Sequence, residues 1–384
     1  MILTRTLAEQ IVAKTMESTH LRINVMNREG IILSSSDPNR VNTFHEAAYR
    51  VVQTGDTMMI SAEESAGLTG TLPGLNMPIL FGADVVGVIG ISGRPEEVVP
   101  FGQAVKMMTE MMLQQAYLME QLITEQRSRD YLAQELITGG TALPRQALVS
   151  RGDLLGIDLT RRRSVILLQL DGAEEEIERW EKQTRPVKQV SSLFPDPHQV
   201  LVTSIRRDRW LIITDLSQQK DSVASKTFLY QIVSRMVAQL RTGRRLHATF
   251  ALGNAYDDLR DLPFSFREAS RVLDILQRFP KLGPVKHVDD VALELMLTEI
   301  SDASRQMIVR ETLGRLRQHP DLLQTLRAFF DHNLQVKQAA EALKIHRNTF
   351  LYRLERIEQL LGVNPREFQQ AVRLQVGLML LEEA

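Results

Sequence analysis

The chain has 384 residues, of which 43% are hydrophobic and 24% charged, and its formal net charge is −1 at pH 7. This length predicts two to three domains, and the balanced charge excludes a polycation, so any nucleic-acid binding needs a local basic surface. The lack of cysteine in the sequence excludes disulfides, thiolate zinc sites and cysteine nucleophiles. Apolar runs stay below transmembrane length and no signal-peptide layout is recognisable, so we expect a cytoplasmic protein without a membrane partner.

The N-terminal region alternates helical and strand patterns. Helices are predicted at residues 3–18 and 44–54, and strands at 22–30, 31–35, 74–82 and 84–93. The last two strands form a hairpin of mostly apolar residues. This order is typical of a PAS-like or Cache-like sensor sheet, which holds a small ligand between one face and its covering loops.

Five stretches of this region carry a family resemblance. They are Ile23-Asn-Val-Met, Gly30-Ile-Ile, the segment 37–46 with its His45-Glu46 pair, Asn76-Met-Pro-Ile, and Gly87-Val-Ile-Gly-Ile-Ser-Gly93. Between about Thr6 and Glu125 the chain resembles the sugar diacid recognition domain of carbohydrate diacid regulators. The resemblance implies a small carboxylate effector of the glycerate, glucarate or galactarate type. The chain departs from the family pattern in the run after Arg40 and at Leu75, and the first departure leaves the identity of the effector open.

Such an effector presents carboxylates and hydroxyls, which bind to guanidinium, imidazolium, amide and hydroxyl groups or to backbone N–H groups. Arg40 and His45 lie on a predicted loop and at the helix entry that follows it. The other candidate ligand contacts are Ser34, Asn76, Gly90, Ser92 and Gly93. Structural alternatives exist, because Asn76 can shape a turn, His45 can cap its helix, and the glycines can permit tight strand packing.

A long helical pattern follows at residues 100–134, with no glycine or proline after Gly102. Apolar residues recur at helical spacing, namely Val105, Met108, Met112, Ala116, Met119, Leu122 and Ile123. A helix of this length predicts a coiled coil or an interdomain signalling helix, and we expect a homodimer or higher homo-oligomer. We interpret the methionines as core or interface residues and expect no metal site and no cofactor. A linker is predicted at 139–144.

The middle region predicts an α+β sandwich. Strands are predicted at residues 163–171, 199–205, 209–215 and 246–253, and helices at 148–155, 225–241 and 265–278. Ala251-Leu-Gly-Asn and the run 265–273 resemble the GGDEF-like domain of the same regulators. A nucleotide cyclase of that fold needs carboxylates for two metals. The chain has no Gly-Gly-Asp/Glu-Glu-Phe hairpin, so we interpret the domain as non-catalytic and Asp171 as a strand-end residue.

The stretch 336–357 predicts two helices with a tight break at Lys344-Ile345. The inward-facing Ala339 and Ala340 allow a second helix to cross closely, as a helix-turn-helix needs. Polar residues at the start of the second helix can hydrogen-bond to phosphates or base edges. The predicted DNA-binding residues are His346, Arg347, Asn348, Thr349, Tyr352, Arg353 and Arg356.

The run Ile345-His-Arg-Asn-Thr-Phe-Leu-Tyr-Arg-Leu-Glu-Arg-Ile357 resembles the PucR-type C-terminal helix-turn-helix. We therefore expect an α+β multidomain protein with a sensor at residues 1–138, a degenerate GGDEF-like domain at 139–290 and an all-α helix-turn-helix domain at 291–384. The expected function is a non-enzymatic, ligand-responsive activator of carbohydrate diacid utilisation genes that binds a double-stranded operator. The alternatives are a nucleotide-processing enzyme of the cyclase fold in the middle domain and a protein-interaction scaffold.

Overall fold

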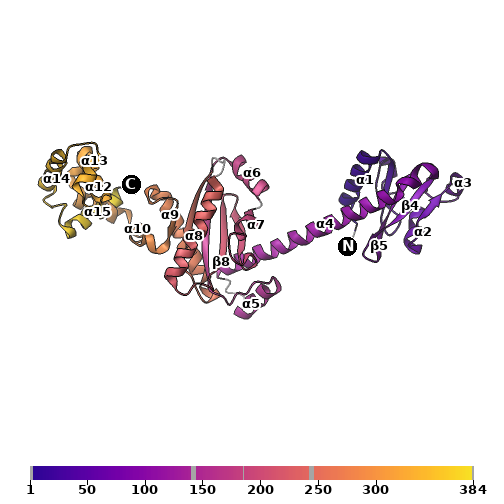
Figure 1. The fold of residues 1–384 in the computed structure, drawn as a ribbon, viewed down its shortest axis with the longest axis horizontal. Coiled ribbons are helices and arrows are strands. Elements are labelled where there is room, and N and C mark those ends of the chain that lie inside the picture. Colours follow the sequence, from indigo (N-terminus) through magenta and orange to yellow (C-terminus); the bar gives the residue numbers. More distant parts are fainter. Residues whose placement is uncertain (1–2, 140–143, 185, 242–245, 383–384) are drawn as a thin grey trace. The chain divides into compact units, whose positions relative to one another are not determined.

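The computed structural model describes residues 3–139, 144–184, 186–241 and 246–382 (Figure 1). The chain divides into two compact units, Met1–Arg127 and Ser128–Ala384. Most of the predicted linker, residues 140–143, lies outside the described residues.

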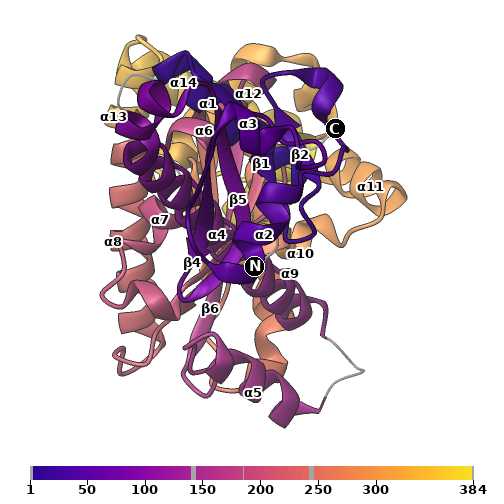
Figure 2. The ribbon, with the colours of Figure 1, turned by 90° about the vertical axis from the view of Figure 1, so that its right-hand side faces the viewer.

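The first unit is built on a five-stranded sheet with strand order β2-β1-β5-β4-β3, all neighbours antiparallel (Figure 2). Its elements are α1 (Arg5–Thr19), β1 (Arg22–Met26), β2 (Ile32–Ser35), the 3-10 turn η1 (Pro38–Arg40), α2 (Glu46–Thr54), β3 (Met58–Ile60), α3 (Ala62–Ser65), β4 (Gly74–Phe81) and β5 (Asp84–Ser92). The hairpin of β4 and β5 lies where the apolar runs predicted it. The sequence did not reveal β3 and α3, because segments of three and four residues show no periodicity.

The two faces of this sheet bury different residues, as strand alternation requires. Ile23 and Val25 of β1 belong to a core that includes residues of α1 and the start of α4 (Pro95–Thr138). Met26, at the end of β1, instead belongs to a small cluster with Val88 and Val51 of α2. The α2 side of the sheet therefore has a thin apolar layer at one end and polar residues at the other.

The helix α4 contributes to two cores. Val105 and Leu113 are buried in the first unit, and Leu132 and Leu136 are buried in the second. Several apolar side chains between these segments are exposed, namely Leu118, Met119, Leu122 and Ile123. The last three belong to the apolar pattern that predicted a coiled coil or a signalling helix, and Met119 and Ile123 line a groove beside α1. The described helices do not include one long and apolar enough to cross a membrane.

The second unit begins with a five-stranded sheet of order β10-β9-β6-β8-β7. Its strands are β6 (Arg163–Asp171), β7 (Leu201–Arg206), β8 (Arg209–Asp215), β9 (His247–Leu252) and β10 (Val285–His287), and its helices are α5 (Arg145–Leu154), α6 (Glu174–Thr184), α7 (Pro186–Ser191), α8 (Ser222–Arg241) and α9 (Leu262–Arg278). Alternate residues of β6 enter two cores: Val165 packs with residues of α9, and Ile166 packs with residues of α8. This is the layered α+β arrangement that the sequence predicted. The elements α6, α7 and β10 were not predicted.

The C-terminal part of the second unit is helical, with α10 (Ala292–Thr298), α11 (Asp302–Leu313), the 3-10 segment η6 (Gly314–Gln318), α12 (Pro320–Asp331), α13 (Val336–Ala342), α14 (Arg347–Leu361) and α15 (Phe368–Glu382). One core joins these helices, and it includes Phe329, Ala339, Ala340, Phe350 and Leu354. The break between α13 and α14 lies at Lys344, whose φ of 55° is left-handed. The predicted close crossing of two helices at the alanines agrees with this packing.

Candidate functional site

A polar row crosses the α2 side of the N-terminal sheet. Asn24 of β1 lies opposite Gly90 of β5, and Gly90 lies opposite Asn76 of β4. Asn24 Nδ2 donates to Ser92 Oγ at 3.1 Å, and Ser35 Oγ donates to Asn24 Oδ1 at 2.7 Å. Both asparagines are 2% exposed. The fold therefore brings amides and hydroxyls from four strands to one end of one face.

Gly90 is the residue that makes room for this row. A Cβ at position 90 would lie 2.9 Å from Asn76 Oδ1 and 3.3 Å from Met26 Cε, so a side chain there would displace both. Gly90 therefore permits close packing, as one interpretation of the sequence proposed, and the atoms packed against it belong to side chains on the face of the sheet. Within the described part of the chain, no hydrogen bond involves the Asn76 side chain, although its polar atoms are not among those that are fully buried without a partner. The Asn76 amide therefore keeps some contact with the surface, and this position is a candidate for contact with a bound molecule.

The predicted helix cap at His45 is present. His45 Nδ1 accepts from the Ala48 amide at 3.2 Å, and the ring is 2% exposed. Burial, and then the charge of Arg40, lower the pKa of His45 to about 4, so the ring is neutral at pH 7. His45 therefore supplies no cation to a carboxylate.

Arg40 lies in η1, and its Nη2 donates to the Gly70 carbonyl at 2.6 Å. Burial lowers the pKa of this guanidinium, which still leaves it charged at neutral pH. The first amides of α2 are occupied, because Glu46 N donates to Thr69 O and Ala47 N to Thr71 Oγ1. Arg40 is thus better placed than this helix start to meet a carboxylate.

Ser34 and Gly93, also predicted as ligand contacts, do not join the hydrogen bonds of the row either. Ser34 pairs with Val25, and the next residue, Ser35, is the one that bonds Asn24. Gly93 directly follows β5 with a φ of 158°, and its amide donates to Pro73 O at 3.0 Å. Sequence reasoning gave Ser35 only as a further donor beside Ser34 and Ser36, and it missed Asn24. The signal that could have found Asn24 is the alternation that puts it between Ile23 and Val25.

The helix-turn-helix presents a polar first turn at the start of α14. His346 is the N-cap, and its Nδ1 accepts from the Asn348 amide at 3.2 Å. The neighbouring Arg347 and Thr349 are exposed, as are His346 and Asn348. Apolar contacts hold the opposite face, where the rings of Phe350 and Phe329 lie 6.0 Å apart. Four predicted DNA contacts therefore share one accessible surface.

The other three predicted DNA contacts differ from one another. Tyr352 is 67% exposed, and Arg356 is exposed with Nη1 donating to Gln359 Oε1. Arg353 is directed instead toward α12, where its Nη1 donates to Thr325 Oγ1 at 3.3 Å and its Nη2 lies 3.8 Å from Asp321 Oδ2. The geometry thus separates Arg353 from the rest of the set.

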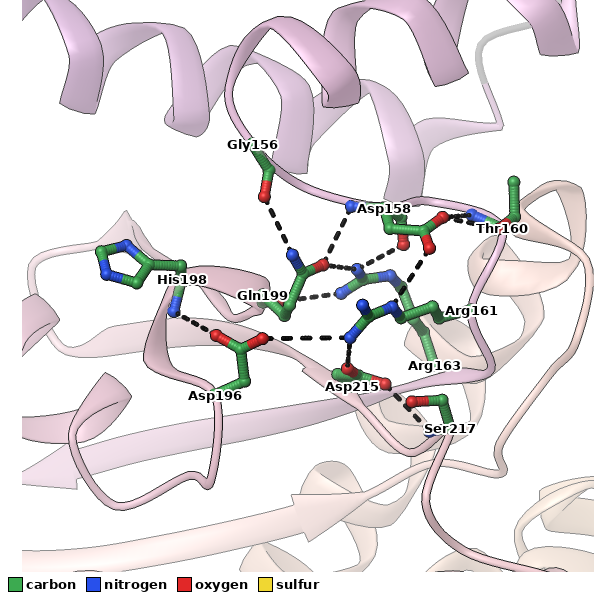
Figure 3. Close-up of polar contacts among 10 residues, drawn as sticks. All are labelled: Gly156, Asp158, Thr160, Arg161, Arg163, Asp196, His198, Gln199, Asp215 and Ser217. Carbon is green, nitrogen blue, oxygen red and sulfur yellow. Dashed lines mark hydrogen bonds and ion pairs between the residues drawn. The ribbon is translucent and has the colours of Figure 1, made fainter.

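In the middle domain, a cluster of polar side chains joins the loop before β6 to the segment that leads into β7 (Figure 3). Arg163 is 1% exposed, and its guanidinium donates to Gln199 O at 2.6 Å and to Asp158 O at 2.8 Å. Burial lowers its pKa to about 10. Arg161 bonds Asp215 Oδ2 at 2.8 Å. These bonds fix a loop, which is a structural role.

Asp171, the strand-end residue that a cyclase would need for metal, is exposed at the end of β6. The described ranges contain no group of three or more His, Asp or Glu side chains that could hold a metal ion. The cluster in Figure 3 belongs to the opposite end of β6.

Comparisons with known proteins assign all three regions. Residues 3–136 match the sugar diacid recognition family, residues 139–275 match the GGDEF-like domain, and residues 322–380 match the PucR C-terminal helix-turn-helix domain. The carbohydrate diacid regulator of Escherichia coli (strain K12) is 29% identical over 381 residues, which cover 98% of this chain and 97% of that protein.

Two relatives come from Bacillus subtilis (strain 168). The uncharacterized protein YsfB is 29% identical over 385 residues and covers 100% of this chain and 99% of its own length. The purine catabolism regulatory protein is 30% identical over 166 residues, which are 42% of this chain and 30% of that protein. The fold, the domain matches and the relatives define a multidomain transcriptional regulator with a C-terminal helix-turn-helix. Within that class, the chain contains a sugar diacid recognition domain and a PucR-type helix-turn-helix, and it is similar over nearly its full length to the carbohydrate diacid regulator.

Proposed function

We propose that this protein is a cytoplasmic transcriptional activator that binds an operator in duplex DNA through α14 and senses a small hydroxy acid or sugar diacid with its N-terminal sheet. The effector is of the glycerate, glucarate or galactarate type, and the regulated genes serve carbohydrate diacid utilisation. The observation that carries this proposal is the first turn of α14, where four exposed donors stand on a helix whose other face is buried.

The chemistry of that turn supports duplex DNA as the target. Arg347 can donate two parallel hydrogen bonds to a guanine, and Asn348 can pair in the same way with an adenine. Thr349 and His346 can donate to phosphates. The net charge of the whole chain is −1, so attraction to DNA must come from this local surface and not from the molecule as a whole.

The sensing part of the proposal rests on the polar row. An antiparallel sheet with hairpins at its edges and a helix over one face supports a PAS-like or Cache-like sensor. A hydroxy acid placed over Gly90 would meet the unpaired Asn76 amide and the Asn24–Ser92 pair. Its carboxylate would pair with Arg40. An effector shifts the protein between two states only by its differential affinity for them, so binding at this row must favour the DNA-binding state.

We further propose that the active species is a homodimer formed through α4. The exposed Leu118, Met119, Leu122 and Ile123 form an apolar surface that monomeric proteins rarely leave uncovered. A second copy would bury this surface and would place two reading helices on one operator. Sedimentation of the full chain tests this: we expect a dimer, and the double variant Leu122→Glu, Ile123→Glu should be a monomer. A monomeric wild-type protein at micromolar concentration would contradict the proposal.

The central experiment measures effector binding and DNA binding on the same protein. Thermal shift with glycerate, glucarate and galactarate identifies the effector, since a specific ligand stabilises the protein by mass action. Fluorescence anisotropy with a duplex selected by the protein from a random library then measures affinity with and without that ligand. We expect tighter binding with the ligand and a steep loss with salt. A reporter transcribed from the selected site should be induced, whereas repression would overturn the activator assignment.

A further inference from the structure

We propose that Arg353 is a positioning residue, which fixes the orientation of α14 through Thr325 of α12 and does not itself contact DNA. This inference rests on the proposed DNA binding of α14. It assigns to Arg353 a different task from that of its neighbours on the same helix.

The contacts of the guanidinium carry the inference. Arg353 Nη1 donates to Thr325 Oγ1 at 3.3 Å. Thr325 is fully buried, and its hydroxyl donates onward to the Asp321 carbonyl at 2.8 Å. The Thr325 hydroxyl therefore donates its proton within α12 and accepts a hydrogen bond from α14. This arrangement fixes the direction from which the Arg353 side chain approaches Thr325.

Burial separates Arg353 from the basic residues around it. The Arg353 side chain is 26% exposed, whereas Arg347 and Arg356 belong to the exposed class. The second partner, Asp321, lies 3.8 Å away and is 57% exposed, so this ion pair contributes little in water. The hydrogen bond to Thr325 is the contact that holds the side chain against α12.

The apolar contacts of α14 with the helical core do not fix the rotation of α14 about its axis. Phe350, Leu354 and Ile357 pack on the apolar core, and apolar contact is proportional to buried area with little dependence on direction. A small rotation of α14 about its axis would keep most of that contact but would move Arg347 and Asn348 off their bases. Thr349 precedes Arg353 by four residues, so the two share a helix face and the tether lies one turn from the reading turn.

The test compares full-length variants on the duplex selected by the wild-type protein, over a series of salt concentrations. We expect Arg353→Gln and Thr325→Val each to weaken binding by about tenfold, as for a hydrogen bond to a charged group. The double variant should be no weaker than the worse single variant, because both changes remove one interaction. The salt dependence should stay at the wild-type slope in all three. The matched control is Arg356→Gln, an exposed arginine on the same helix, which should lower the slope by about one if it contacts a phosphate.

A conservative variant separates positioning from simple loss of stability. Thr325→Ser keeps the accepting oxygen but loses a buried methyl group, so it should lower the melting temperature and yet retain wild-type affinity at temperatures where it is folded. A purely structural role predicts instead that affinity follows stability through the series. This comparison also serves if Thr325→Val fails to fold.

The outcomes are distinguishable. A wild-type protein that selects no duplex overturns the proposed function and this inference together. Normal wild-type binding with an unaffected Thr325→Val, or a slope reduced by about one in Arg353→Gln, overturns only the positioning role. The second result would make Arg353 a direct phosphate contact.

Discussion

The polar row of the N-terminal sheet and the first turn of α14 both offer hydrogen-bonding side chains, but they meet water in opposite ways. Asn24 and Asn76 are each 2% exposed, and the row uses neutral amides and hydroxyls. Arg347 and Asn348 are exposed and lie on a basic surface. Most groups of a site with little exposure must be satisfied when it is empty, and Asn24, Ser35 and Ser92 bond to one another in this way. An exposed site is hydrated when empty, so water can solvate a charged side chain such as that of Arg347.

The comparison predicts that each polar surface depends on the apolar layer behind it, and the largest effect is expected at α14. Phe350→Ala removes a fully buried ring from the helical core and should lower the free energy of unfolding by about 3–5 kcal/mol. The control is Tyr352→Ala on the next turn of the exposed face, which should change stability by roughly 0.5 kcal/mol or less. Chemical denaturation of both variants measures this, and equal losses would contradict the assigned faces.

The pH dependence of the sensor sharpens the contrast at His45. Its pKa is lowered to about 4 from 6.5, so the unfolded chain binds the proton more readily than the folded one. The contribution of neutral His45 to stability is therefore fully present above pH 6.5 and is lost as the pH falls toward 4. The loss should be roughly 3 kcal/mol. Denaturation at several pH values should show this slope in the wild type. His45→Asn, which keeps a capping side chain, should flatten it.

The reading surface should respond to a single exposed side chain without a change in stability. Arg347→Ala is expected to weaken binding to the selected duplex by roughly 1–3 kcal/mol and to relax specificity at one base pair. Anisotropy titrations with matched and mismatched duplexes measure both effects. Unchanged affinity would remove Arg347 from the reading surface.

The two asparagines of the row should differ in their effect on stability, and the smallest change of all is expected at Asn76. Asn76→Leu removes an amide that makes no hydrogen bond among the described residues and keeps some contact with the surface, so the stability of the ligand-free protein should change by roughly 0.5 kcal/mol or less. The same variant should lose the thermal shift caused by the effector. Asn24→Leu breaks the bonds to Ser35 and Ser92 and should cost roughly 1–2 kcal/mol without ligand. Equal costs for the two variants would show that Asn76 is paired in solution.

Local pattern predicted much of the fold. The apolar run 163–171 and the strand of β8 have the bounds that alternation and flanking turns indicated. β10 could not be predicted, because its three residues pair in parallel with β9 and carry no periodicity of their own.

The candidate sites also differed in how far local sequence could predict them. His346 and its neighbours are local to one helix turn, so their shared surface follows from spacing alone. The row at Asn24 depends on register, and a bulge between Val25 and Met26 shifts that register so that Ser35, and not Ser34, meets the amide. Arg353 could not be separated from the other basic residues by sequence, because its partner Thr325 lies on a different helix.

The loop that Arg163 fixes contains three consecutive arginines, Arg161, Arg162 and Arg163, and so three adjacent trypsin sites. A protease needs this backbone free and extended, but the Arg163 amide donates to Tyr256 O and the Arg162 carbonyl accepts from the Leu216 amide. The folded middle domain should therefore resist cutting at 161–163, and trypsin will cleave there only in molecules that have opened. Because cleavage of an open form tracks its population when closing is fast, the rate of this cut is a built-in measure of the stability of the middle domain.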